Sequence, residues 1–425
     1  MNDKKIIDVT LTSHQDEKLK IILEEILIKY RKRVLLTGSA GVGKTTLVNF
    51  LLETFINEVN SGIIYIAAPT HKALSVLKTK IAMEEEHDPV TFCTIHKGLK
   101  LKMQINKRTG SKHFVQKFSK KDPPFRGCKL LIIDEASMLN QYQLDLLAQY
   151  NFTIIFIGDE KQINPVKEIN SPVFHQNWLN IELTEIIRQG EGNPIIELSR
   201  DLSRIWKGEE STVGVGDKRT GFLYTNDRPK IIYKLAEING TDELKYLAWT
   251  NAEVDAINFS VRAQIYGNPS LLEVGESIVL NNPYVISDDN ILHNNQEIKV
   301  ETLEVIVKTF YCNGNPFDYK VYFINGELYT IHEDFIAMHH ANLRKLKALA
   351  INSVIDWREY YGFSEQFLDF KYNHALTIHK SQGSTYKDAI VNIVDIKRNK
   401  KKEEVQRLLY TAITRASNLL ILYNI

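Results

Sequence analysis

The sequence predicts an α/β protein with two parallel-sheet cores, because the same alternation of strands and helices occurs twice along the chain. Short runs that are apolar on both faces alternate with segments of helical periodicity, which is typical of buried parallel strands. In the first 180 residues these runs are Val34–Leu36, Ile63–Ala67, Leu130–Ile133 and Ile154–Ile157, preceded by a predicted helix from about Thr12 to Tyr30. The pattern restarts near Thr184 and includes Leu244–Trp249, Ala375–Thr377, Ala389–Val394 and Leu419–Leu422.

A basic segment interrupts the first core. Between Lys97 and Lys121 there are nine Lys or Arg residues and no acidic residue. Side chains alternate along Leu101–Ile105 and again along His113–Phe118, with the turn-forming sequence Lys107–Ser111 between them, so we predict a β-hairpin. The one-sided charge indicates a polyanionic partner, and a merely solvated loop is the alternative.

A β-rich block interrupts the second core from about Glu276 to His340. The dipeptide Asn325-Gly326 lies between two short apolar runs, which is a strong signal for a tight hairpin. Short strands with turns at this spacing suggest a small barrel. The following residues, 341–361, are predicted as a helix with an apolar stripe through Leu343, Leu346, Ala350, Val354 and Trp357.

Length and composition limit the class of protein. A chain of 425 residues with 44% hydrophobic residues and a net charge of +1 has material for two to four domains with buried cores. Cys93, Cys128 and Cys312 are too scattered for a zinc site or a disulfide framework, which fits a reducing cytosol. No export signal is visible, and no apolar run approaches the roughly 20 residues needed to cross a bilayer. We therefore expect a soluble cytoplasmic protein that does not bind membranes.

Residues 38–45 read Gly-Ser-Ala-Gly-Val-Gly-Lys-Thr, a complete phosphate-binding loop between a predicted strand and a predicted helix. The glycines let the backbone approach a polyphosphate closely, and the amides at the helix start point at the anion. Lys44 is expected to reach the β- and γ-phosphates, and the Thr45 hydroxyl to hold Mg²⁺. The sequence thus predicts a nucleoside triphosphate bound by Gly38, Ser39, Ala40, Gly41, Val42, Gly43, Lys44, Thr45 and Thr46.

Polar residues follow two further predicted strands. Asp134 and Glu135 come directly after Leu130–Ile133. An aspartate there can bind Mg²⁺ through water, and the neighbouring glutamate can activate the attacking water. Gln162 follows Ile154–Ile157 and is expected to sense the γ-phosphate, with an ordinary polar turn as the alternative.

These residues and five further segments, taken in order, resemble the superfamily 1 helicases, most closely the Dda-type phage helicases and the RecD-like enzymes. The segments are Ala67–Ala73, Thr94–His96, Leu183–Arg188, Thr377–Ser384 and Tyr410–Ala416, so that the resemblance spans essentially the whole chain. It implies two RecA-like P-loop motor domains, at 1–98 with 122–185 and at 186–275 with 371–425. It also implies a wedge-like hairpin inserted at 99–121 and an SH3-like β-barrel with helices inserted at 276–370.

The resemblance assigns roles in hydrolysis. Arg188 and Arg415 would be arginine fingers of the second motor domain that reach the γ-phosphate when the domains close, with an interdomain salt bridge as the structural alternative. Gly383 would contact the nucleotide, and Gln15 would contact adenine. Thr12 to Gln15 also fits a helix capping box, which leaves Gln15 with a local structural role as the alternative. Ile187 stands where many 3′-to-5′ relatives carry an aromatic residue, which favours the 5′-to-3′ branch.

The resemblance also implies a single-strand track across both motor domains. The residues expected to line it are Pro69, Thr70, His71, Thr94, His96, Asn251, Thr377, His379 and Ser381. The hairpin is expected to add Lys107, Arg108, Lys112 and Phe114. Trp249 would stack on a base, although a tryptophan that ends a strand more often packs in a core. His96 and His379 have the alternative of structural histidines.

Together, these features predict an ATP-dependent DNA helicase that uses ATP and Mg²⁺, travels 5′ to 3′ on single-stranded DNA and unwinds forked duplex DNA. We expect a monomer in the cytosol of a bacterial or phage-infected cell, in replication or recombination, with replication proteins such as a single-strand-binding protein as partners. Two alternatives stay open. One is an RNA-directed helicase of the same superfamily, and the other is a non-unwinding translocase or ATP-switched binding module of a larger complex.

Overall fold

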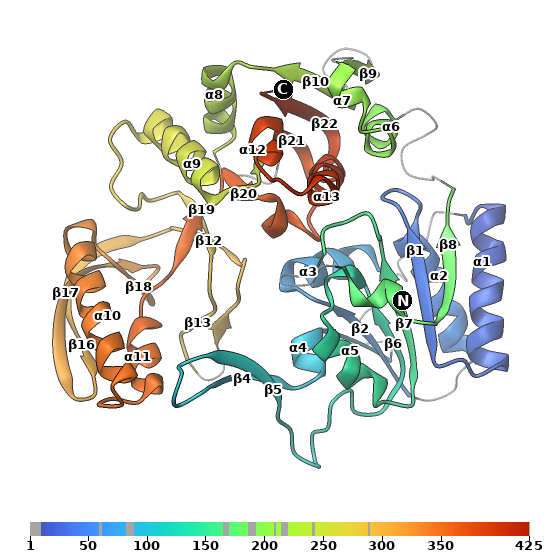
Figure 1. Cartoon of the computed structure of the whole chain (residues 1–425), viewed down its shortest axis with the longest axis horizontal. Coiled ribbons are helices and arrows are strands. Elements are labelled where there is room, and N and C mark those ends of the chain that lie inside the picture. Colours follow the sequence, from blue (N-terminus) through green and yellow to red (C-terminus); the bar gives the residue numbers. More distant parts are fainter. Residues whose placement is uncertain are drawn as a thin grey trace, which may run out of the picture.

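Six parallel strands form the sheet of the first core, in the order β3-β2-β6-β7-β1-β8 (Figure 1). Their bounds are β1 Arg33–Gly38, β2 Ile63–Ala68, β3 Val90–Thr94, β6 Cys128–Ile133, β7 Thr153–Gly158 and β8 Leu179–Leu183. All neighbouring strands pair in parallel, which confirms the prediction from the apolar runs. The computed structural model describes residues 10–58, 62–81, 89–164, 170–185, 193–207, 210–213, 220–239, 243–287 and 290–424.

Helices cover both faces of this sheet, which is why its strands are apolar on both sides. One face packs against α1 Ser13–Leu23, α2 Lys44–Glu58 and α3 His71–Lys80, and the other against α4 Ile95–Gly98 and α5 Gln141–Ala148. A π-helical turn, Glu24–Ile28, extends α1, and 3-10 turns occur at Ala136–Met138 and Pro172–His175. Because the strands are parallel, the carboxyl ends of β1, β6 and β7 meet at one edge of the sheet.

The second core contains a six-stranded sheet in the order β20-β11-β21-β22-β10-β9. Only the edge strand β9 is antiparallel to its neighbour. The bounds are β9 Ser211–Val213, β10 Thr220–Thr225, β11 Leu244–Ala248, β20 Ala375–Thr377, β21 Tyr386–Asn392 and β22 Ala416–Tyr423. One face packs against α8 Arg228–Ile238 and α9 Asn251–Tyr266. The other packs against α6 Pro194–Arg200, α7 Arg204–Lys207, α12 Ile393–Lys397 and α13 Lys402–Ile413.

The basic segment folds as an antiparallel hairpin of β4 Leu101–Ile105 and β5 Lys112–Gln116. Met103 pairs with Phe114 across the two strands, and both side chains are exposed. The sheet is too narrow to bury a face by itself, so its stability depends on what its ends contact. The chain enters the hairpin from α4 and returns to β6 of the first core.

The β-rich block forms three small sheets, β15-β12-β19, β13-β14 and β16-β17-β18. The bounds are β12 Ser277–Leu280, β13 Tyr284–Val285, β14 Ile291–Leu292, β15 Glu297–Lys299, β16 Leu303–Cys312, β17 Asn315–Ile324, β18 Leu328–Ile331 and β19 Phe370–Tyr372. The predicted tight hairpin is confirmed between β17 and β18, where Asn325 and Gly326 have φ values of 51° and 73°. These positive angles explain why Asn and Gly stand there.

The prediction of one helix through 341–361 was wrong. The structure has α10 Ile336–Ile351, preceded by a 3-10 turn at Glu333–Phe335, and a separate helix α11 Trp357–Ser364. Ser353 has a φ of 58°, which ends the first helix, and the Asp356 carboxylate caps the second by accepting the Arg358 N–H at 2.8 Å. Val354 is consequently exposed instead of lying on the predicted apolar stripe.

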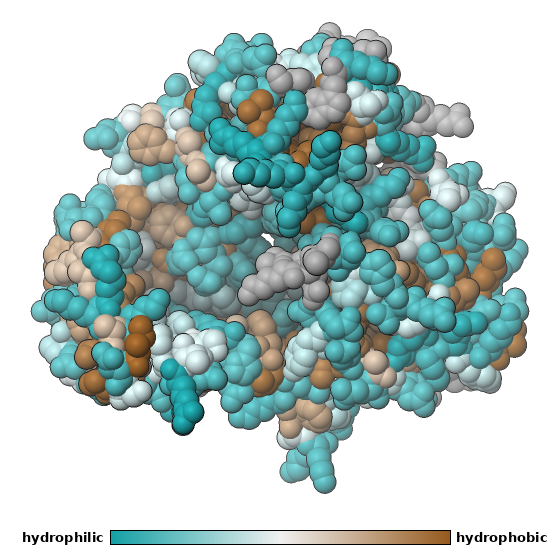
Figure 2. Space-filling model, viewed as in Figure 1, coloured by the Kyte–Doolittle hydropathy of each residue, from teal (hydrophilic) through white to brown (hydrophobic). Residues whose placement is uncertain are grey.

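Figure 1 shows the two cores against each other, with the insertion beside them and the β4–β5 hairpin reaching from the first core to α11. The face in Figure 2 is mostly hydrophilic, and hydrophobic residues are scattered over it in small groups. Within the described ranges, we find no helix of sufficient length and apolar character to traverse a bilayer.

Candidate active site

The phosphate loop joins the end of β1 to the start of α2. Gly41 and Gly43 have φ values of 86° and 75°, which residues other than glycine rarely adopt. At Gly38 a Cβ atom would lie 2.7 Å from Val42 and 2.8 Å from a backbone oxygen, so this position also requires glycine. The Lys44 ammonium group donates to the carbonyl oxygens of Gly38 and Ser39, at 2.5 and 3.0 Å. The loop therefore has its anion-binding shape, with the lysine folded over it.

A cavity of about 360 Å³ opens in front of this loop. Its wall from the first core includes Ala40, Gly41, Val42, Gly43, Lys44, Thr45, Thr46, Asp134, Glu135 and Gln162. Gly383 and Arg415 of the second core complete the wall. Residues that the sequence places far apart are thus brought together in one interdomain cavity. Ser39 contributes its carbonyl to Lys44 and lies on the other side of the loop, in a neighbouring cavity.

Two carboxylates lie at the bottom of this cavity. Burial raises the pKa of Asp134, and burial together with the Asp134 charge raises the pKa of Glu135 to about 7. Glu135 has a left-handed backbone, with a φ of 50°, at the turn after β6. A carboxyl group tuned near neutrality is suited to accept a proton from water.

Thr45 and Asp134 both line the cavity in front of the phosphate loop. A hydroxyl and a carboxylate are oxygen ligands of the kind that Mg²⁺ prefers, and a cation there would also relieve the burial of the Asp134 charge. These two residues fit a nucleotide-bound Mg²⁺.

Gln162 and Arg415 both line the cavity, and both side chains have buried polar atoms. The Gln162 Oε1 atom is buried and has no hydrogen-bond partner among the described residues, so an acceptor is available for a group in the cavity. Arg415 is buried, with 6% of the residue exposed, and its guanidinium group donates to the carbonyl oxygens of Thr411 and Ser384, at 3.1 and 3.0 Å. Arg188 and Ile187 lie outside the described residues.

Gly383 sets how closely the two cores approach. Its φ is 72°, and a Cβ atom there would lie 2.8 Å from the Ala73 Cβ atom in α3. Any larger residue would push the second core away from the first. The glycine is therefore a contact residue between the cores as well as part of the cavity wall.

Tyr410 of α13 makes a contact that sequence reasoning missed. Its hydroxyl accepts the Ala40 N–H at 3.0 Å and donates to the Asp159 carboxylate at 2.5 Å, and its side chain is buried. Burial and the Asp159 charge raise its pKa, so the hydroxyl stays protonated and acts as a donor. The second core thereby holds the phosphate loop directly, and nothing in the sequence around Tyr410 reveals that contact.

Two neighbours of Tyr410 extend this contact to the segment that carries Gln162. Arg407 donates to the Gln162 carbonyl oxygen at 3.1 Å, and the Thr411 hydroxyl accepts the Ile163 N–H at 3.3 Å. The Gln382 amide of the second core donates to the Ile163 carbonyl oxygen at 3.2 Å. Movement of the second core would consequently displace both the phosphate loop and the Gln162 segment.

The capping interpretation of Gln15 is confirmed. Thr12 and Gln15 exchange side-chain and backbone hydrogen bonds, both of 3.3 Å, in a capping box at the start of α1. The Gln15 amide also donates to the carbonyl oxygens of Val42 and Gly43 in the phosphate loop, at 3.3 and 3.4 Å. Gln15 therefore braces the loop, and its contact with adenine stays a prediction.

Three threonines of the predicted track start helical turns. Thr70, Thr94 and Thr377 accept backbone N–H groups of α3, α4 and the 3-10 turn Ile378–Ser381. Each is followed, directly or one residue later, by a histidine: His71, His96 and His379. The caps fix where these histidines stand. His96 packs at 4.6 Å, between ring centroids, from Phe114 of the hairpin, and Pro69 directly precedes the first cap.

Other predicted track residues make contacts within the protein. Ser381 is fully buried and donates to the Ile378 carbonyl oxygen, so its hydroxyl is not presented to a ligand. Trp249 packs against the second core, in agreement with its structural alternative. Asn251 accepts a hydrogen bond from Lys371. Lys112 forms an ion pair at 2.5 Å with Glu365, the residue that follows α11, while Lys107 and Arg108 are exposed at the hairpin turn.

Comparisons with known proteins support the same domains. An AAA domain model matches residues 24–168, and a UvrD-like helicase C-terminal domain model matches residues 372–423. The ATP-dependent DNA helicase dda of Enterobacteria phage T4 is 29% identical over 95% of this chain and 97% of its own length. The ATP-dependent DNA helicase Pif1 of Campylobacter jejuni is 24% identical over 93% of this chain and 89% of its own. The solved structure of Bacteroides Pif1 helicase with ADP-AlF3 and single-stranded DNA is 18% identical, with a TM-score of 0.52 over 97% of this chain and 92% of that one.

The fold and the shared cavity define a nucleotide-driven motor built from two RecA-like domains, with the nucleotide site between them. Among such motors, this chain is similar to the superfamily 1 helicases of the Dda and Pif1 type, as the two family matches and the relatives that align along nearly the whole chain show.

The substitution Glu135→Gln should lower the rate of ATP turnover at least roughly 100-fold, because it removes a general base without changing the shape of the cavity. Binding of a fluorescent ATP analogue should stay close to that of the parent, since the phosphate loop is untouched. Glu160→Gln, at an exposed neighbouring carboxylate, is the matched control and should hydrolyse normally. Normal turnover in the Glu135 variant would contradict the assignment of this residue.

The substitution Tyr410→Phe removes the hydroxyl that joins Ala40 to Asp159 and keeps the aromatic ring. We expect nucleic-acid-stimulated ATPase to fall roughly 10-fold, the effect of losing one or two hydrogen bonds to a charged partner. Steady-state kinetics should place the loss in kcat, because ATP itself still meets an intact loop. Tyr142→Phe, at an exposed tyrosine of α5, controls for the chemical change. A parental kcat in the Tyr410 variant would show that this contact does not transmit domain closure.

Proposed function

We propose that this chain is an ATP-dependent DNA helicase that moves 5′ to 3′ on single-stranded DNA and unwinds forked duplexes. The observation that carries the motor is the composite cavity, in which Arg415 and Gly383 of the second core face the phosphate loop of the first. An arginine that reaches the γ-phosphate from a second domain makes hydrolysis depend on domain closure, and it contributes roughly 10³–10⁵ in rate. ATP binding closes the two cores, and hydrolysis and product release open them again.

Mg²⁺ belongs to this proposal, with Thr45 and Asp134 as its protein contacts. Bound Mg²⁺ would neutralise the charge that develops on the phosphates. Glu135 orients and deprotonates the attacking water, and the unpartnered Gln162 oxygen is placed to hold that water or a phosphate-bound group. Lys44 exchanges its carbonyl partners in the loop for phosphate oxygens.

The hairpin β4–β5 is proposed to act as the wedge that separates the strands. Met103 and Phe114 are 50% and 42% exposed and pair across its strands, which presents an apolar surface where a terminal base pair can stack. Each separated base pair requires on the order of 1.4 kcal/mol, so the wedge must be held firmly while the motor advances.

Contacts at the hairpin tip supply that support. Gly110 packs against the Trp357 ring so closely that a Cβ atom would lie 2.4 Å from it. The Tyr361 hydroxyl donates to the Gly110 carbonyl oxygen at 2.8 Å, and Lys112 lies 3.8 Å from the Tyr361 ring centroid. The insertion, which we assign as an SH3-like barrel with helices at 276–370, thus braces the wedge through α11. The 5′-to-3′ direction is supported by resemblance alone, through Ile187.

Replacing Leu101–Phe118 by a short Gly-Ser linker should leave most of the DNA-stimulated ATPase, because the nucleotide cavity lies elsewhere. Unwinding of a forked duplex should fall by at least about tenfold, since each step would lose the structure that holds the strands apart. A strand-displacement assay with 5′-tailed and 3′-tailed duplexes measures both this loss and the direction of travel. A deletion variant that unwinds as fast as the parent would refute the wedge.

Substituting both Lys107 and Arg108 with alanine should flatten the salt dependence of single-strand binding. If both residues contact phosphates, the slope of log affinity against log salt changes by roughly 1.4, about 0.7 for each contact. Lys112→Ala is the internal control and should leave the slope unchanged, because Glu365 already neutralises that ammonium group. An unchanged slope in the double variant would mean that the turn does not contact the single strand.

A further inference from the structure

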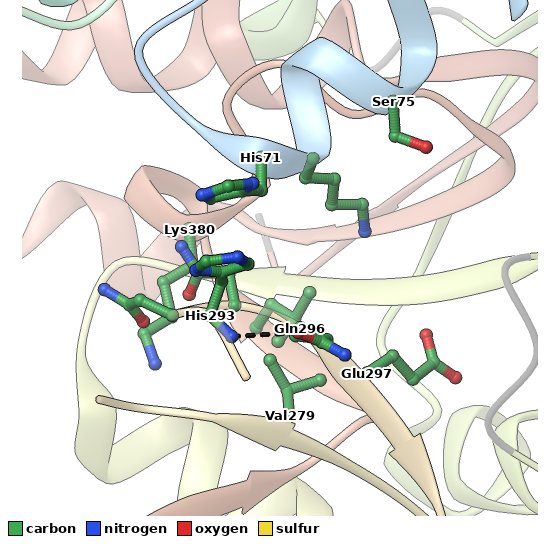
Figure 3. A pocket seen from close by; sticks show the side chains of 11 residues that line it. His71, Ser75, Val279, His293, Gln296, Glu297 and Lys380 are labelled. Atoms are coloured by element: carbon green, nitrogen blue, oxygen red, sulfur yellow. Dashed lines mark hydrogen bonds between the residues drawn. The ribbon is translucent and has the colours of Figure 1, made fainter. Parts of the chain in front are cut away.

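Two histidines from different parts of the chain stack face to face beside the predicted track. His71 begins α3 of the first core, and His293 lies in the turn between β14 and β15 of the insertion. Their ring centroids are 3.6 Å apart and the ring planes differ by 8° (Figure 3). The rings are parallel and closer than the centroid separation of about 4.5–7 Å that aromatic pairs usually adopt.

The stack borders a cavity of about 400 Å³, within the range of small-molecule sites. Lys72 of the first core and Lys380 of the second line this cavity, as do the residues that follow His293. The cavity is therefore shared by both cores and the insertion, and it carries two ammonium groups beside the pair of flat rings.

A buried acceptor in the same cavity lacks a partner. The Asn295 Oδ1 atom is buried and has no hydrogen bond within the described residues, although its backbone N–H is bonded to Leu280. The turn around it is fixed: His293 donates its N–H to the Gln296 side chain at 2.8 Å, and Gln296 donates back to the His293 carbonyl oxygen. An unsatisfied acceptor held in a rigid turn is matched by a ligand with N–H donors.

Both imidazole rings are neutral near pH 7. Burial lowers the pKa of His71 to about 4, and burial lowers the pKa of His293 as well. Neutral rings can lie against a neutral aromatic ligand without desolvating a charge. The ring faces can therefore stack on a nucleobase, and the neighbouring lysines can contact the phosphates of its strand.

We propose that His71 and His293 are the two walls of a slot for one nucleobase of the single strand, and that the slot is closed on itself in the empty molecule. The proposal rests on the single-strand binding proposed above. To admit a base, the insertion must move away from α3 by about one base thickness, roughly 3.4 Å. The base then replaces each imidazole as the stacking partner of the other, the Asn295 oxygen accepts from its amine or imide, and Lys72 and Lys380 lie near the backbone.

The alternative is that the stack only joins the insertion to the first core. The two hypotheses differ in whether the histidines stack on a nucleobase or only join two parts of the protein. The test therefore compares short oligothymidine with an abasic oligomer of the same length, which keeps the phosphates but offers nothing to stack. Fluorescence anisotropy on the full chain without nucleotide gives both dissociation constants.

We expect His71→Ala and His293→Ala each to weaken oligothymidine binding at least about 5-fold, the lower end of base–aromatic stacking. The double variant should lose little more than the worse single variant, because both rings hold the same base. Binding of the abasic oligomer should be unchanged in all three. His293→Phe keeps a flat aromatic face and should retain oligothymidine binding. If binding required the imidazole group itself, this variant would lose it.

His340→Ala removes an exposed histidine of α10 and is the matched control. Unchanged oligothymidine binding in His293→Ala would overturn the slot, and so would an equal loss on the abasic oligomer, which would mark the stack as a structural contact only. Failure of the parent chain to bind either oligomer would refute the proposed single-strand binding itself, and the slot with it. If the parent binds both oligomers and the variants bind them equally well, only the slot is refuted and the proposed single-strand binding stands.

Discussion

The contact of the second core with the phosphate loop is the constraint on which the rest of this molecule depends. Tyr410 bonds to Ala40 in the loop, and Gly383 lets the second core approach α3 without a gap. With the cores in contact, Arg415 of the second core lines the nucleotide cavity of the first. A motor needs such a bistable interface, since small changes at the nucleotide become domain movement only where packing has two discrete arrangements.

Burial inside that interface sets the chemistry of the cavity. Asp134 and Glu135 share a desolvated space, so that their carboxyl groups resist ionisation and the pKa of Glu135 rises to about 7. A nucleotide with its cation compensates this cost, which makes the closed arrangement favourable when the nucleotide is present.

The insertion reaches both proposed nucleic-acid elements of the first core. Its helix α11 holds the hairpin tip through Trp357 and Tyr361, and its β14–β15 turn places His293 against His71. The insertion thus connects the proposed wedge, the proposed base slot and, through β19 and β20, the second motor core. Movement of that core on nucleotide binding would displace both the proposed wedge and the proposed base slot, because the connection passes through packed side chains and short strands.

The sequence by itself determined the class of this protein, since apolar runs, the phosphate loop and the ordered segments are local patterns that periodicity and turn chemistry make readable. It predicted most strands of both cores, the Asn325-Gly326 hairpin and the resemblance to superfamily 1 helicases, and these predictions are confirmed, whereas β3, β8, β9 and β10 were not predicted. It predicted one helix where Ser353 and Asp356 make two, because an apolar stripe can cross a break that backbone angles impose. Only the tertiary structure decided that Gln15 hydrogen-bonds to the phosphate loop and that Ser381 is buried. It also decided three contacts between residues far apart in the chain: Lys112 with Glu365, Tyr410 with Ala40, and His293 with His71. Those outcomes depend on which surfaces meet after the chain has folded, and no local pattern encodes the distance between residues of different domains.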